Sequence, residues 1–245
     1  MPDIAVILPT LNERANLAPM VDRLAEALAA LDWEAIFVDD DSTDGTADEA
    51  RALAQANPRI RALQRIGRRG LASAVIEGAC STAAPVIVVM DADHQHDPAL
   101  IPQMLEELRS SDLVVASRFA EGGDADGLSS AAREKGSRIA NRLARALTGV
   151  DLSDPMSGFF MIETARVRAL APRLSGIGFK VLLDILSVSP ERLRVAEVPM
   201  HFGERRSGES KLDRAVAFEF LVGLYERYFG RIFPTRFALF GTVGG

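Results

Sequence analysis

The chain alternates short apolar runs with longer stretches in which apolar residues recur at helical spacing. The short runs are typical of buried strands and are found at residues 4–8, 35–38, 60–63, 86–90 and 113–116. The stretches with helical spacing or composition predict helices at residues 16–31, 46–55, 71–83 and 99–109. Strands that alternate with helices form βαβ units. The pattern therefore predicts an α/β fold with a mainly parallel central sheet flanked by helices.

The second half of the chain is less regular. A Gly-rich polar passage at 120–128 precedes a basic helix at about 130–147, and turn residues then lead into an apolar strand that ends near Ile162. A short helix is predicted from 178 to 186 and a strand from 194 to 199. Residues 201–211 carry three cations and two glycines, which predicts a mobile loop that orders on an anion.

Polar and acidic residues follow the predicted strands. In open α/β sheets the ligand binds beyond the carboxyl ends of the strands. If the strands are parallel, one edge of the sheet collects the side chains of Glu13, Asp39, Asp40, Asp91, Asp93, Gln95 and Arg118.

The segment VIVVMDADHQHDP at residues 86–98 is the most informative of these strand ends. Its Asp-x-Asp pair supplies hard oxygen ligands of the kind that Mg²⁺ and Mn²⁺ prefer. An isolated Asp-x-Asp is more often a solvated acidic turn, here before Pro98, so a cation site is expected only if the rest of the chain supplies a nucleotide site. Neither a Gly-x-Gly-x-x-Gly motif after the first strand nor a Walker A motif is present, which disfavours dinucleotide-binding and P-loop proteins.

Composition narrows the class of protein further. The 245 residues suit one large α/β domain or one domain plus a small appendage, and a net charge of −6 argues against a nucleic-acid partner. The single cysteine, Cys80, excludes an internal disulfide and lies in the Ala-rich helix, where we expect it to pack in the interior. No stretch reaches the roughly 18 apolar residues that would span a membrane.

Four motifs in order resemble a known family. They are PTLNERANL at 9–17, VDDDSTDGT at 38–46, MDADHQHDP at 90–98 and GERRSGESKL at 203–212. Together they are similar to the inverting GT-A glycosyltransferases of family 2 that act on polyprenyl phosphates, the dolichol-phosphate mannose synthase type. The resemblance implies the GT-A fold over residues 1–212.

The resemblance also implies roles for individual residues. Donor binding would involve Pro9, Leu11, Glu13, Val38, Asp40, Asp91, Ala92, Asp93, Gln95, Arg118, Lys180, Arg205 and Lys211. Asp93 and Gln95 would hold the divalent metal, Mg²⁺ or Mn²⁺, and Asp91, Asp93 and Arg118 would be catalytic. Arg118, Arg133 and Ser137 would bind the acceptor phosphate. Because a hard Mg²⁺ prefers oxygen ligands, His94 and His96 are expected to be structural or to support the ligand residues. Asp154 is expected to be either sugar-facing or structural.

The implied reaction transfers a hexose from a nucleotide sugar to a polyprenyl phosphate with inversion. GDP-mannose is the first expected donor, with UDP-glucose or another UDP-sugar as the alternative. A GT-A enzyme with a saccharide hydroxyl acceptor and a non-enzymatic binding module are the competing classes.

The C-terminal part of the chain points to a membrane surface. Residues 213–233 interleave aromatic and aliphatic residues with charges, which predicts amphipathic helices that either lie on lipid or are buried. Residues 234–245 resemble the start of a membrane domain. We therefore expect an enzyme associated with the cytoplasmic face of a membrane.

Overall fold

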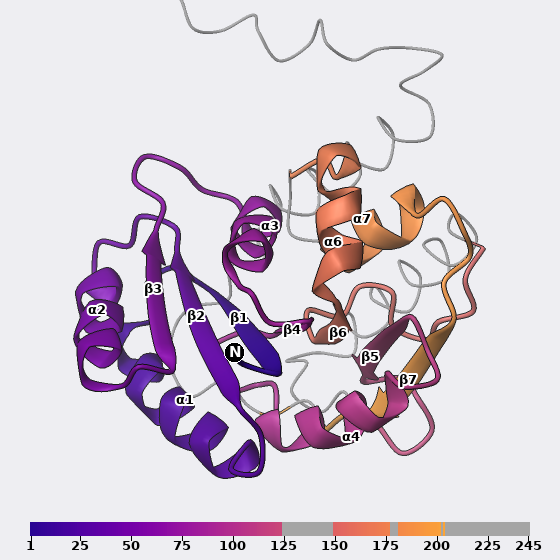
Figure 1. Cartoon of the computed structure of the whole chain (residues 1–245), viewed down its shortest axis with the longest axis horizontal. Coiled ribbons are helices and arrows are strands. Elements are labelled where there is room, and N and C mark those ends of the chain that lie inside the picture. The colour runs from indigo at the N-terminus through magenta and orange to yellow at the C-terminus, as the bar shows by residue number, and fades with distance from the viewer. Residues whose placement is uncertain (124–148, 177–180, 202, 204–245) are drawn as a thin grey trace, which may run out of the picture.

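A computed structural model describes residues 1–123, 149–176, 181–201 and 203. In this part of the chain, seven strands form one sheet with the order β3-β2-β1-β4-β6-β5-β7 (Figure 1). The strands are β1 (Ile4–Thr10), β2 (Trp33–Asp39), β3 (Ile60–Gln64), β4 (Val86–Val89), β5 (Leu113–Ser117), β6 (Phe160–Glu163) and β7 (Val195–Pro199). Only β6, among these strands, runs antiparallel to its neighbours β4 and β5. The predicted mainly parallel sheet is confirmed.

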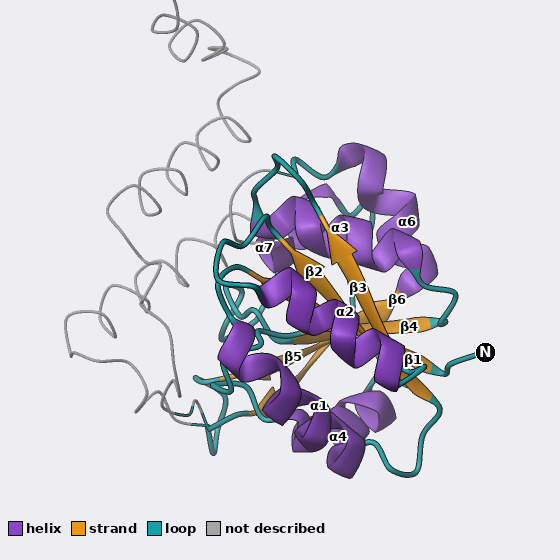
Figure 2. Ribbon diagram, turned by 90° about the vertical axis from the view of Figure 1, so that its left-hand side faces the viewer, coloured by secondary structure: helices purple, strands orange, loops and turns teal. Residues whose placement is uncertain are grey.

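Helices cover both faces of the sheet. One face carries α1 (Arg14–Ala27), α2 (Thr46–Ala56) and α4 (Ile101–Glu107), and the other carries α3 (Leu71–Ser81), α6 (Thr164–Leu170) and α7 (Val181–Val188). Figure 2 shows α1 and α4 together on one side of the strands and α3, α6 and α7 on the opposite side. Two short 3₁₀ helices, Pro98–Leu100 and Ala171–Arg173, adjoin α4 and α6.

The hydrophobic core is divided between the two faces by the alternation of side chains along each strand. In β1, Ile4, Val6 and Leu8 pack with α1 and α4, while Ala5 and Ile7 pack with α3. All five are fully buried, as expected for a strand at the centre of a parallel sheet.

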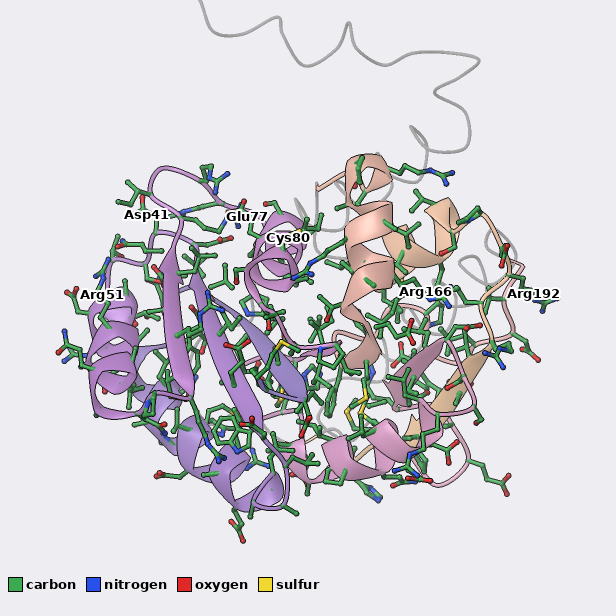
Figure 3. The ribbon with its side chains drawn as sticks, viewed as in Figure 1. Asp41, Arg51, Glu77, Cys80, Arg166 and Arg192 are labelled. Atoms are coloured by element: carbon green, nitrogen blue, oxygen red, sulfur yellow. The ribbon has the colours of Figure 1, made fainter. Side chains whose placement is uncertain are left out.

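Two expectations from the sequence need correction. The helix predicted at 99–109 is a 3₁₀ turn followed by the shorter α4, which has a proline near its start that lacks an N–H group. Cys80, which we expected in the interior, is exposed near the end of α3 (Figure 3), because the buried face of this helix is formed by residues such as Val75 and Ala79.

The loops that follow the parallel strands gather at one edge of the sheet. Hydrogen bonds between neighbouring strands continue there, from Asp40 N to Thr10 O (2.9 Å) and from Arg65 N to Asp39 O (2.9 Å). Because β6 is antiparallel, the segment that precedes it reaches the same edge as the segment that follows β5. The predicted site residues that the structure describes therefore lie at or next to this edge.

Candidate functional site

Each of three loops at the carboxyl edge contains one non-glycine residue with a strained backbone conformation. Asn12, Asp41 and His94 have φ angles of 56°, 59° and 69°, and they are the non-glycine residues with positive φ in the described part of the chain. They follow β1, β2 and β4. Such conformations cost roughly 1 kcal/mol or more and persist where the surrounding contacts determine them, most often at functional sites.

The loops after β1 and β2 are tied together by hydrogen bonds. The backbone N–H of Asn12 donates to Ser42 Oγ (2.8 Å), and that of Thr43 donates to Asn12 Oδ1 (3.0 Å). Glu13 N donates to Thr46 Oγ1 (2.9 Å) in the same way. These contacts fix the predicted nucleoside-binding segments relative to each other.

Asp39 and Asp40 are both buried but have different partners. Asp39 accepts hydrogen bonds from the backbone N–H (3.0 Å) and the hydroxyl of Ser42, which closes a turn. Asp40 accepts a hydrogen bond from Arg65 Nη1 at Oδ1 (2.5 Å) and one from the backbone N–H of Gly70 at Oδ2 (2.7 Å). Sequence reasoning missed Arg65, because nothing in its local pattern distinguishes a buried arginine from a solvated one.

The acidic turn after β4 is organised by His96. The backbone N–H of Asp91 donates to His96 Nδ1 (3.0 Å), so this nitrogen is unprotonated and the proton of the neutral ring is on Nε2. Burial lowers the pKa of His96 and outweighs the raising effect of Asp91 and Asp93. The ring also packs against Phe159, with 5.2 Å between the ring centroids. These contacts fit the structural role expected for His96.

The two carboxylates of the Asp-x-Asp pair lie at different depths. The Asp91 side chain is 41% exposed, whereas Asp93 is 3% exposed and accepts a hydrogen bond from the backbone N–H of Gln95 (3.1 Å). The Gln95 amide donates through Nε2 to the carbonyl of Gly203 (3.1 Å), and Gly203 N donates back to the carbonyl of Gln95 (3.1 Å). The Asp-x-Asp turn is thereby joined to the start of the predicted basic loop.

His94 occupies the centre of this turn and has contacts on both ring nitrogens. Its Nε2 lies 3.1 Å from the carbonyl oxygen of Asn16, and its Nδ1 lies 3.3 Å from Arg23 Nη1. Arg23 also pairs with Asp97 (3.0 Å). His94 thus joins the turn to α1, in keeping with the structural role expected of it.

Arg118 and Asp154 form a bidentate ion pair at the carboxyl edge, where Arg118 directly follows β5 and Asp154 precedes β6. Arg118 Nε donates to Asp154 Oδ2 (2.7 Å) and Nη2 donates to Oδ1 (2.9 Å). Asp154 is fully buried and the Arg118 side chain is 13% exposed. Asp154 was expected to be either sugar-facing or structural. The geometry matches the structural role, because both carboxylate oxygens accept hydrogen bonds from Arg118.

The remaining predicted site residues fall into three groups. Pro9, Leu11 and Glu13 are partly exposed at the edge, whereas Val38 and Ala92 are 0% and 2% exposed, so their side chains are not brought to the surface there. The following lie outside the described residues: Arg133, Ser137, Lys180, Arg205 and Lys211.

The described residues also bear on metal binding and on membrane insertion. Among them, no group of three or more His, Cys, Asp and Glu side chains is arranged to hold a metal ion. Nor does any helix in residues 1–123, 149–176 or 181–201 have the length and apolarity needed to cross a bilayer.

The fold is shared with solved glycosyltransferases. Glucosyl-3-phosphoglycerate synthase from Mycobacterium tuberculosis, in complex with Mn²⁺, UDP-glucose and phosphoglyceric acid, superposes with a TM-score of 0.67 at 23% identity, over 92% of this chain and 79% of that one. The same enzyme with Mg²⁺ and UDP gives a TM-score of 0.65 at 21% identity, over 92% and 79% of the two chains. The sheet with an Asp-x-Asp turn at its carboxyl edge defines the class of GT-A glycosyltransferases.

The chain belongs to glycosyl transferase family 2, whose model matches residues 5–168. It is 38% identical to the dolichol-phosphate mannosyltransferase of Pyrococcus furiosus over 98% of this chain and 68% of that protein. It is 36% identical to the Saccharomyces cerevisiae enzyme of the same name, over 98% and 92% of the two chains. The undecaprenyl-phosphate mannosyltransferase of Micrococcus luteus is 33% identical over 90% and 92%. The family expected from the four motifs is confirmed.

Proposed function

We propose that this protein transfers a mannosyl residue from a nucleotide sugar, GDP-mannose in the first instance, to a polyprenyl phosphate. The products are a β-linked polyprenyl phosphate sugar and a nucleoside diphosphate. The observation that carries the proposal is the convergence, at one sheet edge, of the Asp91–Asp93 turn and the fixed guanidinium of Arg118. The names of the similar proteins support the choice of mannose and of a lipid phosphate.

The donor is proposed to lie across the loops after β1, β2 and β4. Pro9, Leu11, Glu13 and Asp40 would bind the nucleoside, and Asp91, Asp93 and Gln95 would face the diphosphate and the sugar. Lys180, Arg205 and Lys211, which lie outside the described residues, would neutralise the leaving diphosphate.

The oxygen-rich turn fits a divalent cation. Mg²⁺ is commonly bound by one or two carboxylates together with substrate phosphates, so a cage of three protein carboxylates is not required. Asp93 and Gln95 would hold the ion, with Asp91 beside the sugar, and both histidines are occupied by other contacts. When bound, Mg²⁺ or Mn²⁺ stabilises negative charge on the leaving diphosphate.

The chemistry of the acceptor explains why no strong base is needed. A phosphate monoester has its second pKa near 6, so it is largely dianionic at neutral pH and attacks the anomeric carbon directly. His96 is no candidate base, since its Nδ1 accepts a backbone hydrogen bond and its ring is buried. The protein's task is to hold acceptor and donor in line, which inverts the anomeric centre in one displacement.

Arg118, Arg133 and Ser137 are proposed to bind the acceptor phosphate, since guanidinium groups bind phosphate oxygens with two hydrogen bonds. We place the reaction at the cytoplasmic face of a membrane, where residues 213–233 would contact lipid. These C-terminal residues lie outside the described part of the chain.

The deciding experiment measures transfer of labelled sugar from GDP-mannose, UDP-glucose and UDP-N-acetylglucosamine to a short polyprenyl phosphate. We expect label in the lipid phase from GDP-mannose with Mg²⁺ or Mn²⁺, and none with chelator. Label from a UDP-sugar alone would change the donor, and absence of lipid label with every donor would refute the lipid-phosphate acceptor.

A variant separates acceptor binding from donor binding. Arg133→Ala should abolish transfer but leave nucleotide affinity nearly unchanged, and Arg145→Ala, in the same predicted helix, serves as the matched control. Unchanged transfer by Arg133→Ala would contradict the acceptor assignment.

A further inference from the structure

Arg65 lies directly after β3 and is buried although it carries a full charge. It is 3% exposed, and its backbone N–H continues the ladder between β3 and β2. A buried guanidinium needs partners for its charge and its donors. Its partners lie at the carboxyl edge (Asp40), in the loop that leads from β3 into α3 (Gly70), and in α3 itself (Ser73 and Glu77).

The guanidinium holds three segments together. Nη1 donates to Asp40 Oδ1 (2.5 Å) and to the carbonyl of Gly70 (3.0 Å), and Nη2 donates to Ser73 Oγ (2.5 Å). Nε lies 3.3 Å from Glu77 Oε1, in an ion pair without hydrogen-bond geometry. Asp41 and Glu77 lie on either side of the loop between β3 and α3 (Figure 3). Both contact this loop, since Gly67 N donates to Asp41 Oδ2 (3.1 Å) and Arg68 pairs with Glu77.

Gly70 closes a ring with Asp40 and Arg65. Its N–H donates to Asp40 Oδ2 (2.7 Å) while its carbonyl accepts from Arg65. Its φ of 139° is rarely adopted by residues with a side chain, and a Cβ there would lie 3.2 Å from Ser73 Oγ. The ring therefore depends on glycine at this position and fixes both oxygens of the Asp40 carboxylate.

We propose that Arg65 is a positioning residue for the donor nucleoside and acts through Asp40. This inference rests on the proposed function, in which Asp40 contacts the nucleoside. An ionised carboxylate accepts hydrogen bonds only, so its orientation decides which N–H or O–H groups of a nucleoside it can receive. A buried ion pair contributes less to stability than apolar residues of similar volume would. Stability alone therefore does not explain why Arg65 and Asp40 are paired at this edge.

The test is a double-mutant cycle on nucleotide affinity, measured by calorimetry with GDP and Mg²⁺ and accompanied by transfer kinetics. Arg65→Lys keeps the charge but loses the branched donors, so we expect GDP affinity to fall about tenfold, as for loss of a hydrogen bond to a charged group. The donor KM should rise by a similar factor while kcat stays within about twofold.

Asp40→Asn and the double variant complete the cycle. If Arg65 acts through Asp40, Arg65→Lys should weaken GDP binding little further in the Asp40→Asn background. Additive effects, or an Arg65→Lys variant with unchanged affinity and a lowered melting temperature only, would overturn the proposal and leave Arg65 a structural residue.

Two further variants keep the test decisive. Arg61→Lys is the matched control, because Arg61 lies on β3, four residues before Arg65, pairs with Glu34 and has a side chain that is 44% exposed. The GDP affinity of Arg61→Lys should equal that of the wild type. Ser73→Ala removes one hydrogen bond to Arg65 and serves as the test variant if Arg65→Lys does not fold. It should weaken GDP binding about twofold to threefold. Unchanged GDP affinity in this variant would overturn the proposal. Failure of the wild type to bind GDP would count against the proposed function instead.

Discussion

Replacing Asp154 by Asn tests the buried Arg118–Asp154 ion pair, in which Arg118 is proposed to bind the acceptor phosphate. Asp154 is fully buried, and its two oxygens accept at 2.7 and 2.9 Å from Arg118. Asparagine has almost the same shape but presents one acceptor and one N–H donor. One of the two hydrogen bonds would therefore become a contact between two donors, and the Arg118 charge would lose its counterion.

The magnitude follows from this burial. Removing one member of a buried ion pair costs about 3–5 kcal/mol. Because the Arg118 side chain keeps 13% exposure and asparagine keeps one acceptor, we expect a loss at the lower end, about 3 kcal/mol. For a domain of this size, a loss of that order lowers the melting temperature by roughly 6–12 °C.

The assay combines thermal unfolding with sugar transfer at a temperature where the variant is folded. Transfer should fall at least about tenfold, because the guanidinium is no longer held in one orientation. Glu106→Gln is the control: Glu106 pairs with Arg109, and the two side chains are 67% and 76% exposed, so loss of this pair should cost about 1 kcal/mol or less and leave transfer unchanged. Transfer within twofold of the wild type in Asp154→Asn would refute the role of the pair, and a melting temperature lowered by less than about 2 °C would refute its energetic weight.

Three further results are expected. Burial lowers the pKa of His96 in the folded chain below the value near 6.5 that it has in the unfolded chain. As the pH drops below about 6.5, the unfolded chain therefore takes up a proton before the folded one does, and the free energy of unfolding should fall by up to about 1.4 kcal/mol per pH unit. Urea unfolding of His96→Asn should show a shallower dependence on pH. Gly158→Ala places a Cβ 3.4 Å from Asp91 Oδ2 and should slow transfer with little loss of stability, whereas Gly78→Ala meets Ile7 Cγ2 at 2.6 Å and should destabilise by about 1–3 kcal/mol; melting curves and rates that show the reverse would contradict this assignment. Chelation should abolish transfer while circular dichroism stays unchanged, and Mg²⁺ or Mn²⁺ should restore it; activity that survives exhaustive chelation would remove the metal from the proposal.

The sequence pattern predicted the strands whose residues are apolar almost throughout. The run at 86–90 is β4 and the run at 4–8 is the first part of β1, since an apolar β-branched segment has few alternatives to a central strand. The strand that ends near Ile162 was also expected, but its antiparallel direction was not, because direction depends on the path of the preceding segment. The pattern likewise predicted one continuous helix after Pro98, whereas the structure has a 3₁₀ turn followed by α4, since Pro102 lacks the N–H for an α-helical hydrogen bond to residue 98.

The candidate site was predictable as a set of strand ends but not as a set of contacts. Loop chemistry placed Asp40, Asp91 and Arg118 at one edge, because strand direction determines which ends meet. Their partners could not be read from the sequence: Arg65 lies 25 residues from Asp40, and Asp154 lies 36 residues from Arg118. Such pairings depend on packing between elements, and a single sequence carries no record of them.

The reversed strand β6 makes the stretch between β5 and β6 a hairpin excursion. The chain leaves the sheet at Ser117 and re-enters at Phe160, next to its point of departure, and Ser117 and Ser153 are joined at the exit by a hydrogen bond between their hydroxyls (2.5 Å). Because the closure entropy of such an excursion grows only with the logarithm of its length, its interior can be shortened, extended or exchanged at little cost to the sheet. The loops after β1, β2 and β4, which we propose to bind the nucleoside and the diphosphate, would keep their contacts with one another in such an exchange. Under the proposed function, this architecture would let the same donor loops be combined with different acceptor-binding segments, by natural recombination or by grafting in the laboratory.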